Sequence, residues 1–177
     1  MLKSFKQFIN EQPKINLYHS KERMQNETDK IRSNLDHSKS NKIDIEYYHQ
    51  KDANGNHYYY RHDGTKPREL SIINKDNIHQ IAHKDSGNSN HIKNFIYHHV
   101  NNYGNVSSDN SNTEGSKKIW MEISKEHPKN MSLYHHNDET NSSVKIDHHY
   151  LKNNEHELWN KSNDAYRHRI ILKRNDK

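Results

Sequence analysis

The chain has 177 residues, a length that suits one domain with some additional terminal sequence. Only 28% of the residues are hydrophobic and 29% are charged, which disfavours a large apolar core and leaves the core to a few well-placed segments. The absence of cysteine excludes disulfides, thiolate metal sites and a cysteine nucleophile, while the net charge of +5 permits contact with acidic partners.

Residues 1–12 are predicted to form a short amphipathic appendage that Pro13 ends, with a single domain over residues 13–177. The apolar residues of the appendage recur at helical spacing; they are Leu2, Phe5, Phe8 and Ile9. No apolar run approaches the length of a membrane span, and we find no signal-peptide core. We therefore expect no membrane contact, and a protein kept in the cytoplasm where it is made or packaged from there.

The first half of the domain is predicted to hold a helix and an antiparallel meander. The expected elements are a helix over residues 20–35 and strands over residues 43–48, 57–61 and 70–73. Asn54-Gly55 is the strongest hairpin signal between the first two of these strands. Residues 77–84 have a pattern that fits either a helix or a strand.

The second half contains the best-founded prediction, an α/β unit from Ser86 to His136 that begins with a loop around Gly87. Its expected elements are a helix over residues 91–103, a strand at Val106, a helix over residues 113–125 and a strand over residues 131–134. Beyond it we expect strands at residues 144–146 and 166–173, with one helical turn at residues 155–160.

This order of elements resembles the GNAT-type N-acyltransferase fold. The resemblance implies an α/β (α+β) protein with a mixed, mostly antiparallel central sheet flanked by helices. In that family a loop of pattern Gln/Arg-x-x-Gly-x-Gly/Ala precedes a helix, and its backbone amides bind the pyrophosphate of acetyl-CoA. The corresponding stretch here has Gly87 in place and Ser89 instead of the second small residue. The residues implied to bind acetyl-CoA are Lys84, Ser86, Gly87, Asn88, Ser89 and Asn90.

The catalytic residues are predicted partly by this resemblance and partly by position. Trp120 stands where the family often has a tyrosine that protonates the departing thiolate, and an indole cannot fill that role. Tyr134, on the strand after the Trp120 helix, is the alternative proton donor. A general base facing an amine is expected on the first strands, with Glu46 preferred over the other candidates. Those other candidates are His49, His57 and Tyr59.

The N-terminal segment resembles the openings of head proteins from T4-like phages. The residues that carry this likeness are Lys3, Phe5, Phe8, Ile9 and Glu11. The resemblance implies a phage protein of the virion or the infected host's cytoplasm, with other virion proteins as partners.

Histidine is the conspicuous reactive side chain, with 17 copies. His79 and His83 form the best pair of metal-ligand candidates, but chance spacing explains them and we assign no metal site. His99 lies on the apolar stripe of its helix and is predicted to be a core residue.

Three functions stay open from the sequence. The first is a phage acyltransferase-like protein. The second is a non-enzymatic structural or internal virion protein. The third is a basic nucleic-acid-associated protein, because segment 58–61 mixes tyrosines with Arg61 and the C-terminal strand is basic.

Overall fold

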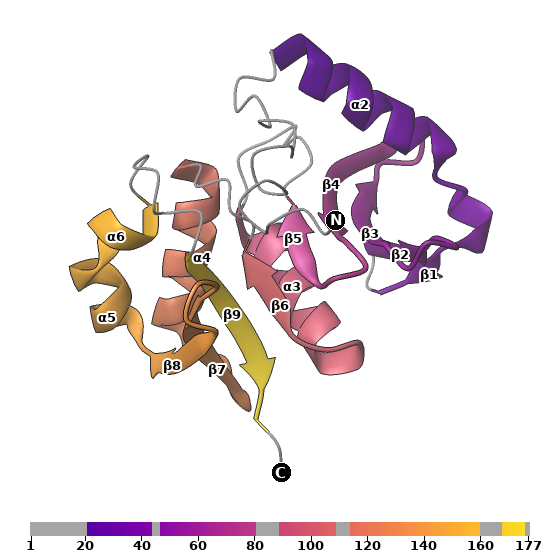
Figure 1. The fold of residues 1–177 in the computed structure, drawn as a ribbon. Helices are drawn as coiled ribbons and strands as arrows, with labels where there is room; N and C mark the ends of the chain where they lie inside the picture. The colour runs from indigo at the N-terminus through magenta and orange to yellow at the C-terminus, as the bar shows by residue number, and fades with distance from the viewer. Residues whose placement is uncertain (1–20, 44–46, 81–88, 109–113, 160–167, 176–177) are drawn as a thin grey trace, which may run out of the picture.

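The computed structural model describes residues 21–43, 47–80, 89–108, 114–159 and 168–175. Its elements are, in chain order, α2 (Lys21–Asn34), the short 3-10 helix η1 (His37–Lys39), β1 (Asn41–Lys42), β2 (Tyr47–Lys51), β3 (His57–His62), β4 (Pro67–Ile73), β5 (Ile78–Gln80), α3 (Ser89–Asn102), β6 (Val106–Ser108), α4 (Glu114–Glu126), β7 (Met131–Asn137), β8 (Ser142–Ile146), α5 (His148–Asn153), α6 (Glu155–Trp159) and β9 (His168–Arg174). They confirm a mixed α+β fold (Figure 1).

All the strands join in one nine-stranded sheet with the order β1-β2-β3-β4-β5-β6-β9-β7-β8. Neighbouring strands are antiparallel except for β5 and β6, which run parallel. The expected mixed, mostly antiparallel sheet is therefore confirmed. The parallel pair requires the crossover helix α3 between its strands, because parallel neighbours cannot be joined by a tight turn.

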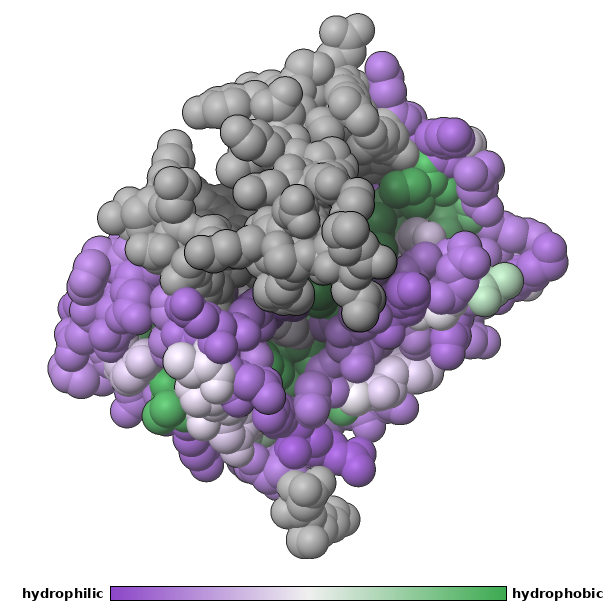
Figure 2. Space-filling model, viewed as in Figure 1, coloured by the Kyte–Doolittle hydropathy of each residue, from purple (hydrophilic) through white to green (hydrophobic). Residues whose placement is uncertain are grey.

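The helices cover both faces of the sheet, and one face carries most of the apolar contacts. On that face α3, α4, α5 and α6 pack over a continuous core that includes Phe95 and Trp120. On the other face α2 lies over the first strands, whereas α3 and α4 lie behind the sheet in Figure 1. Figure 2 shows hydrophilic residues over most of the visible described surface, with hydrophobic residues in recesses and in a few small exposed patches. The small hydrophobic surface follows from the low hydrophobic content of the chain.

The predicted meander is confirmed, and its turns explain the register. The Asp52 carboxylate accepts backbone N–H bonds from Asn54 and Asn56, at 2.9 and 2.8 Å, and Gly55 supplies the positive φ of +88°. This closes β2 onto β3 so that His49 stands opposite Tyr59. The ambiguous stretch at residues 77–84 is a strand over its described part, β5, and its later residues lie outside the described chain.

The predicted unit around α3 and α4 is also confirmed, and an ion pair between a buried lysine and a more exposed carboxylate joins its two helices. Lys93 on α3 is only 5% exposed and bonds with Glu126 at the end of α4. The Tyr97 hydroxyl donates to the same carboxylate at 2.8 Å, and Glu122 lies 3.4 Å from the Lys93 ammonium. Burial disfavours the charge of Lys93, but the hydrogen bond and charge of Glu126 outweigh it and raise the pKa of the lysine.

The elements η1, β1 and α5 and the place of β9 in the sheet were not predicted. Helix α5 was missed because its six residues hold little apolar pattern beyond Leu151; its N-cap is Asp147, whose carboxylate accepts the N–H of Tyr150 at 2.8 Å. The insertion of β9 between β6 and β7 was missed as well. In the described part of the chain, no helix is long and apolar enough to cross a membrane.

Candidate functional site

Strands β5 and β6 are the parallel pair in the middle of the sheet, and their carboxyl ends lie at the same edge of it. Ile78 of β5 stands beside Ser107 of β6, and the Ser107 N–H donates to the Asn77 carbonyl at 2.8 Å. Both strands run in the same direction, so their carboxyl ends lie side by side. Helix α3 begins at Ser89, and eight residues separate it from the end of β5 at Gln80. In α/β sheets, the carboxyl ends of parallel strands and the following helix N-terminus are a frequent place for anionic ligands.

The predicted cofactor residues fall largely outside the described chain. Residues 84–88 are not described, which includes Lys84, Ser86, Gly87 and Asn88. Ser89 and Asn90 are the first two residues of α3, and Asn90 is exposed. The structure thus puts the described part of the predicted loop at a helix N-terminus, where backbone N–H groups lack partners within the helix.

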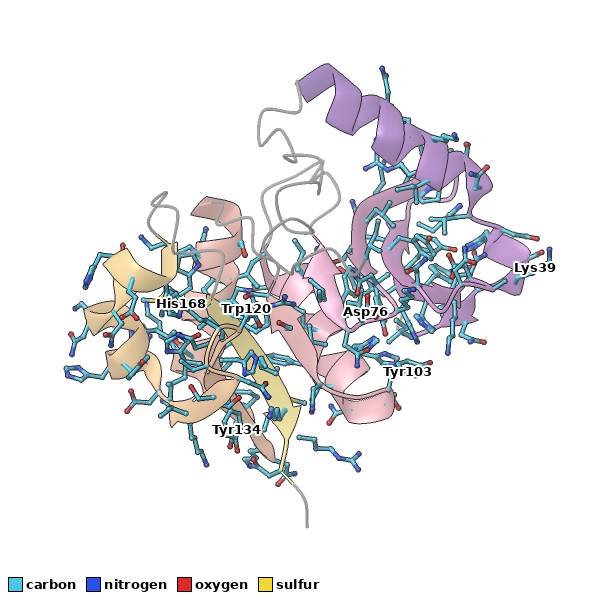
Figure 3. The ribbon with its side chains drawn as sticks, in the orientation of Figure 1. Lys39, Asp76, Tyr103, Trp120, Tyr134 and His168 are labelled. Carbon is cyan, nitrogen blue, oxygen red and sulfur yellow. The ribbon has the colours of Figure 1, made fainter. Side chains whose placement is uncertain are left out.

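Of the two predicted catalytic residues, Tyr134 is described and Glu46 lies outside the described chain. Tyr134 stands opposite Ile171 of β9, which in turn stands opposite Ser107 of β6. Directly opposed residues share a face, and strands are about 4.8 Å apart, so Tyr134 lies about 10 Å across the sheet from Ser107. Its ring is half-buried, with the Lys173 ammonium 4.7 Å from the ring centre. Figure 3 shows Tyr134 on β7, across β9 from the parallel pair.

Trp120 is a core residue. Its side chain is 1% exposed and belongs to the apolar cluster under α3 and α4. It fills volume and offers no proton to a ligand. Proton donation at the predicted site would have to come from another residue.

The other predicted base candidates lie together away from solvent, in what we call the histidine cluster. Its members are His49, His57, His98, His99, Tyr59 and Tyr103. The cluster lies between strands β2 and β3 and the C-terminal end of α3. His49, His57 and Tyr59 are 2%, 5% and 0% exposed, so none of them is open to an amine substrate. His99 is fully buried, which confirms its predicted place in the core.

Hydrogen bonds join the members of this cluster. His49 Nε2 lies 2.8 Å from His57 Nδ1, and His49 Nδ1 lies 3.3 Å from the Tyr103 hydroxyl. The Tyr59 hydroxyl lies 2.9 Å from His99 Nδ1, and His99 Nε2 lies 3.4 Å from Asn77 Oδ1. An amide oxygen only accepts, so His99 donates from Nε2 and accepts the Tyr59 proton at Nδ1.

Burial keeps these imidazoles neutral. Loss of hydration, followed by the nearby charge that His57 would carry, lowers the pKa of His49 to about 4. Burial and then the charge of Lys51 lower the pKa of His57, while Asp52 partly opposes this. Burial lowers the pKa of His98, whose Nδ1 is enclosed and has no hydrogen-bond partner within the described residues.

A second histidine pair connects β7 and β9 with the α5–α6 layer. His135 Nε2 lies 2.8 Å from His168 Nδ1, and His135 Nδ1 lies 2.8 Å from the Tyr150 hydroxyl. His168 Nε2 faces Glu157 at 3.7 Å. Burial and then the neighbouring His168 lower the pKa of His135. Neither histidine pair could be predicted from the sequence, because both pairs depend on which residues become diagonal neighbours on adjacent strands.

Within the described residues, no group of three or more histidine, aspartate or glutamate side chains is arranged to hold a metal ion. His79 lies on β5, and His83 is outside the described chain. Searches against protein-family models, curated proteins and solved structures find no match to this chain. The candidate site therefore depends on its own geometry: two parallel strand ends, a helix N-terminus and a tyrosine on the same sheet.

Proposed function

We propose that the protein is an acyltransferase-like protein that binds acetyl-CoA through residues 84–90 and the N-terminal amides of α3. The observation that carries the proposal is the parallel pairing of β5 and β6 in a sheet that is otherwise antiparallel. This pairing supports a ligand site beside the start of α3, at Ser89. The elements on which the acyltransferase resemblance rests occur in the observed order, with β1, β5 and α5 in addition.

Phosphate binding fits the chemistry of this end of the sheet. The first N–H groups of α3 have no partners within the helix, and the helix dipole favours negative charge there. Gly87 has no Cβ and lets a backbone segment approach a phosphate closely. The net charge of +5 also favours the approach of a highly anionic cofactor.

The proposed chemistry assigns a role to Tyr134. An amine attacks the thioester carbonyl, the carbon–sulfur bond breaks, and the departing thiolate takes a proton. Tyr134 is the proposed donor of that proton, because Trp120 is enclosed in the core and carries no suitable acid. Glu46 stays the proposed base for the amine.

Calorimetric titration with acetyl-CoA tests the binding proposal. The unmodified protein should release or absorb heat with saturation below about 1 mM. Ser89→Asp should weaken binding by about tenfold, because the new carboxylate repels the phosphates of acetyl-CoA. The same carboxylate should stabilise the helix, because it lies at the positive end of the helix dipole. Gly87→Trp should abolish binding by filling the loop.

Asn94→Asp is the matched control, because Asn94 is exposed on α3 and receives the same charge about 7.5 Å further along the helix axis. Its affinity should stay within about twofold of the unmodified protein. Absence of heat from the unmodified protein would contradict the proposal. Equal affinities for the Ser89→Asp and Asn94→Asp variants would contradict this location of the site.

A further inference from the structure

The histidine cluster joins α3 to the sheet at the end of the helix opposite Ser89. The two ends of α3 lie about 20 Å apart along its axis. The C-terminal turn contributes His98, His99 and Tyr103, while β2 and β3 contribute the facing side chains. Figure 3 shows Tyr103 at this end of the helix, with Asp76 in the neighbouring turn. The cluster is therefore separate from the proposed cofactor site.

The contacts of the cluster depend on neutral imidazoles. The facing nitrogens of His49 and His57 can share one proton, but not two, because two N–H groups would then meet at 2.8 Å. Similarly, a proton on Nδ1 of His99 removes the acceptor that the Tyr59 hydroxyl uses. Within the described residues, neither His49 nor His57 bonds with a carboxylate, so a proton on either forms no ion pair.

The charged groups around the cluster do little to stabilise a positive charge on its imidazoles. Lys51, at the end of β2, opposes protonation of both His49 and His57. Asp52 favours a charge on His57, but its carboxylate already accepts bonds from the adjacent turn and from Tyr58. From the β4–β5 turn, exposed Lys75 and Asp76 offset one another in sign. From β9, the Arg174 guanidinium donates to the Asn101 carbonyl at 3.0 Å and adds positive charge.

The rest of α3 is held by contacts that do not involve these histidines. Ile92, Phe95 and Ile96 are buried in the core shared with α4. Lys93 and Tyr97 bond with Glu126 of α4. Strain at the histidine cluster therefore acts on the last turn of the helix, where the buried side chain of Val100 and the exposed Arg174 bond are the remaining restraints.

We propose that the histidine cluster is an acid-sensitive latch, which holds the C-terminal turn of α3 against β2 and β3 near neutral pH and releases it when the imidazoles take up protons. Release uncovers His49, His57 and the Tyr59 ring, which are all buried in the latched form. The open form takes up protons more readily, because an exposed imidazole has an ordinary pKa near 6.5. In the closed form the pKa of His49 is about 4. For His49 alone, this difference raises the opening equilibrium about 80-fold at pH 4.5.

Hydrogen–deuterium exchange of the whole chain between pH 7.5 and 4.5, corrected for intrinsic exchange rates, tests the latch. Amides of residues 99–103 should lose protection by about 50-fold or more at pH 4.5, while amides of α4 change less than about fivefold. The double variant His49→Gln, His57→Gln keeps hydrogen-bonding groups at two positions that can no longer titrate, so its last turn should respond several-fold less than that of the unmodified protein, with the residual response coming from His98 and His99. The control His156→Gln, at an exposed position on α6, should respond like the unmodified protein.

Simultaneous loss of protection in α3 and α4 would overturn the latch, because it would indicate global acid unfolding. An unchanged pH response in the double variant would overturn it too. If that variant does not fold, an NMR pH titration of the imidazole resonances of the unmodified protein tests the latch instead. His49 and His57 should both titrate below the ordinary range of an imidazole, together with opening of the turn, and ordinary titration with the turn still protected would contradict the proposal.

Discussion

At the scale of single residues, Tyr134 gives the sharpest test of the proposed chemistry. Tyr134→Phe removes the hydroxyl and keeps the ring that the Lys173 ammonium covers. If the hydroxyl protonates the departing thiolate, the rate of thiol release from acetyl-CoA with a mixture of primary amines should fall about 100-fold. Acetyl-CoA affinity, measured by calorimetry, should not change.

Tyr103→Phe serves as the comparison for Tyr134→Phe, because Tyr103 is 45% exposed and lies at the other end of α3 from the proposed site. Its rate should stay within about twofold of the unmodified protein. If both variants keep full activity, Tyr134 is not the proton donor. If Tyr134→Phe instead weakens acetyl-CoA binding at an unchanged rate, the residue contacts the cofactor without taking part in the chemistry.

Two features of the histidine cluster show which parts of the site could be predicted from the sequence and which could not. The burial of His99 followed from its place on a helical stripe with Ile92 and Phe95, a local pattern that any helix would express. The bond between His49 and His57 did not follow, because the two are diagonal neighbours whose approach depends on the exact register of β2 and β3. The predicted role of His49 as a base is hard to reconcile with its burial.

At the scale of elements, the ion pair between α3 and α4 is the contact most open to test. Lys93→Met should reduce the free energy of unfolding by about 2 kcal/mol, because Glu126 and Glu122 lose their shared cation in a partly enclosed place. Urea unfolding followed by tryptophan fluorescence would measure the change. Trp120, buried on α4, contributes to this signal together with Trp159 at the end of α6.

Lys118→Met is the matched control for Lys93→Met, because Lys118 reaches Glu122 at 3.9 Å while its side chain remains 63% exposed. Screening by water makes such a pair weak, so the change should stay within about 0.5 kcal/mol. Equal losses in the two variants would mean that burial of Lys93 does not matter to stability.

Most elements were predictable because their signals are local. The periodicity of α3 and the Asn54-Gly55 turn each act within a few residues. The parallel pairing of β5 and the place of β9 were not predictable, since β5 has only three residues and strand order depends on distant partners. Helix α5 depends on a single cap and one buried leucine, too little for a periodic pattern.

At the scale of the whole molecule, the two histidine pairs make stability depend on pH. Because the pKa of His49 is lowered from 6.5 to about 4 on folding, its contribution is complete above pH 6.5 and is lost as the pH falls toward 4. His135 is shifted in the same direction. We expect the free energy of unfolding to fall by about 2 kcal/mol from His49 alone between pH 7.5 and pH 5.

Urea titrations at pH 7.5 and pH 5, at one ionic strength, would measure this dependence. The variant His49→Gln should show a smaller difference between the two pH values than the unmodified protein. Equal or greater stability at pH 5 would contradict the expected direction. Because this experiment measures global unfolding, it is independent of the local exchange that tests the latch.

The position of β9 between β6 and β7 has a consequence for synthesis on the ribosome. Strand β9 pairs with both of these earlier strands, and β6 and β7 have no direct pairing in the sheet. Until residues 168–174 have emerged, the nascent chain holds two partial sheets with open inner edges. Such edges bind other strands readily, so we expect the partial sheets to be prone to aggregation until β9 pairs with both of them.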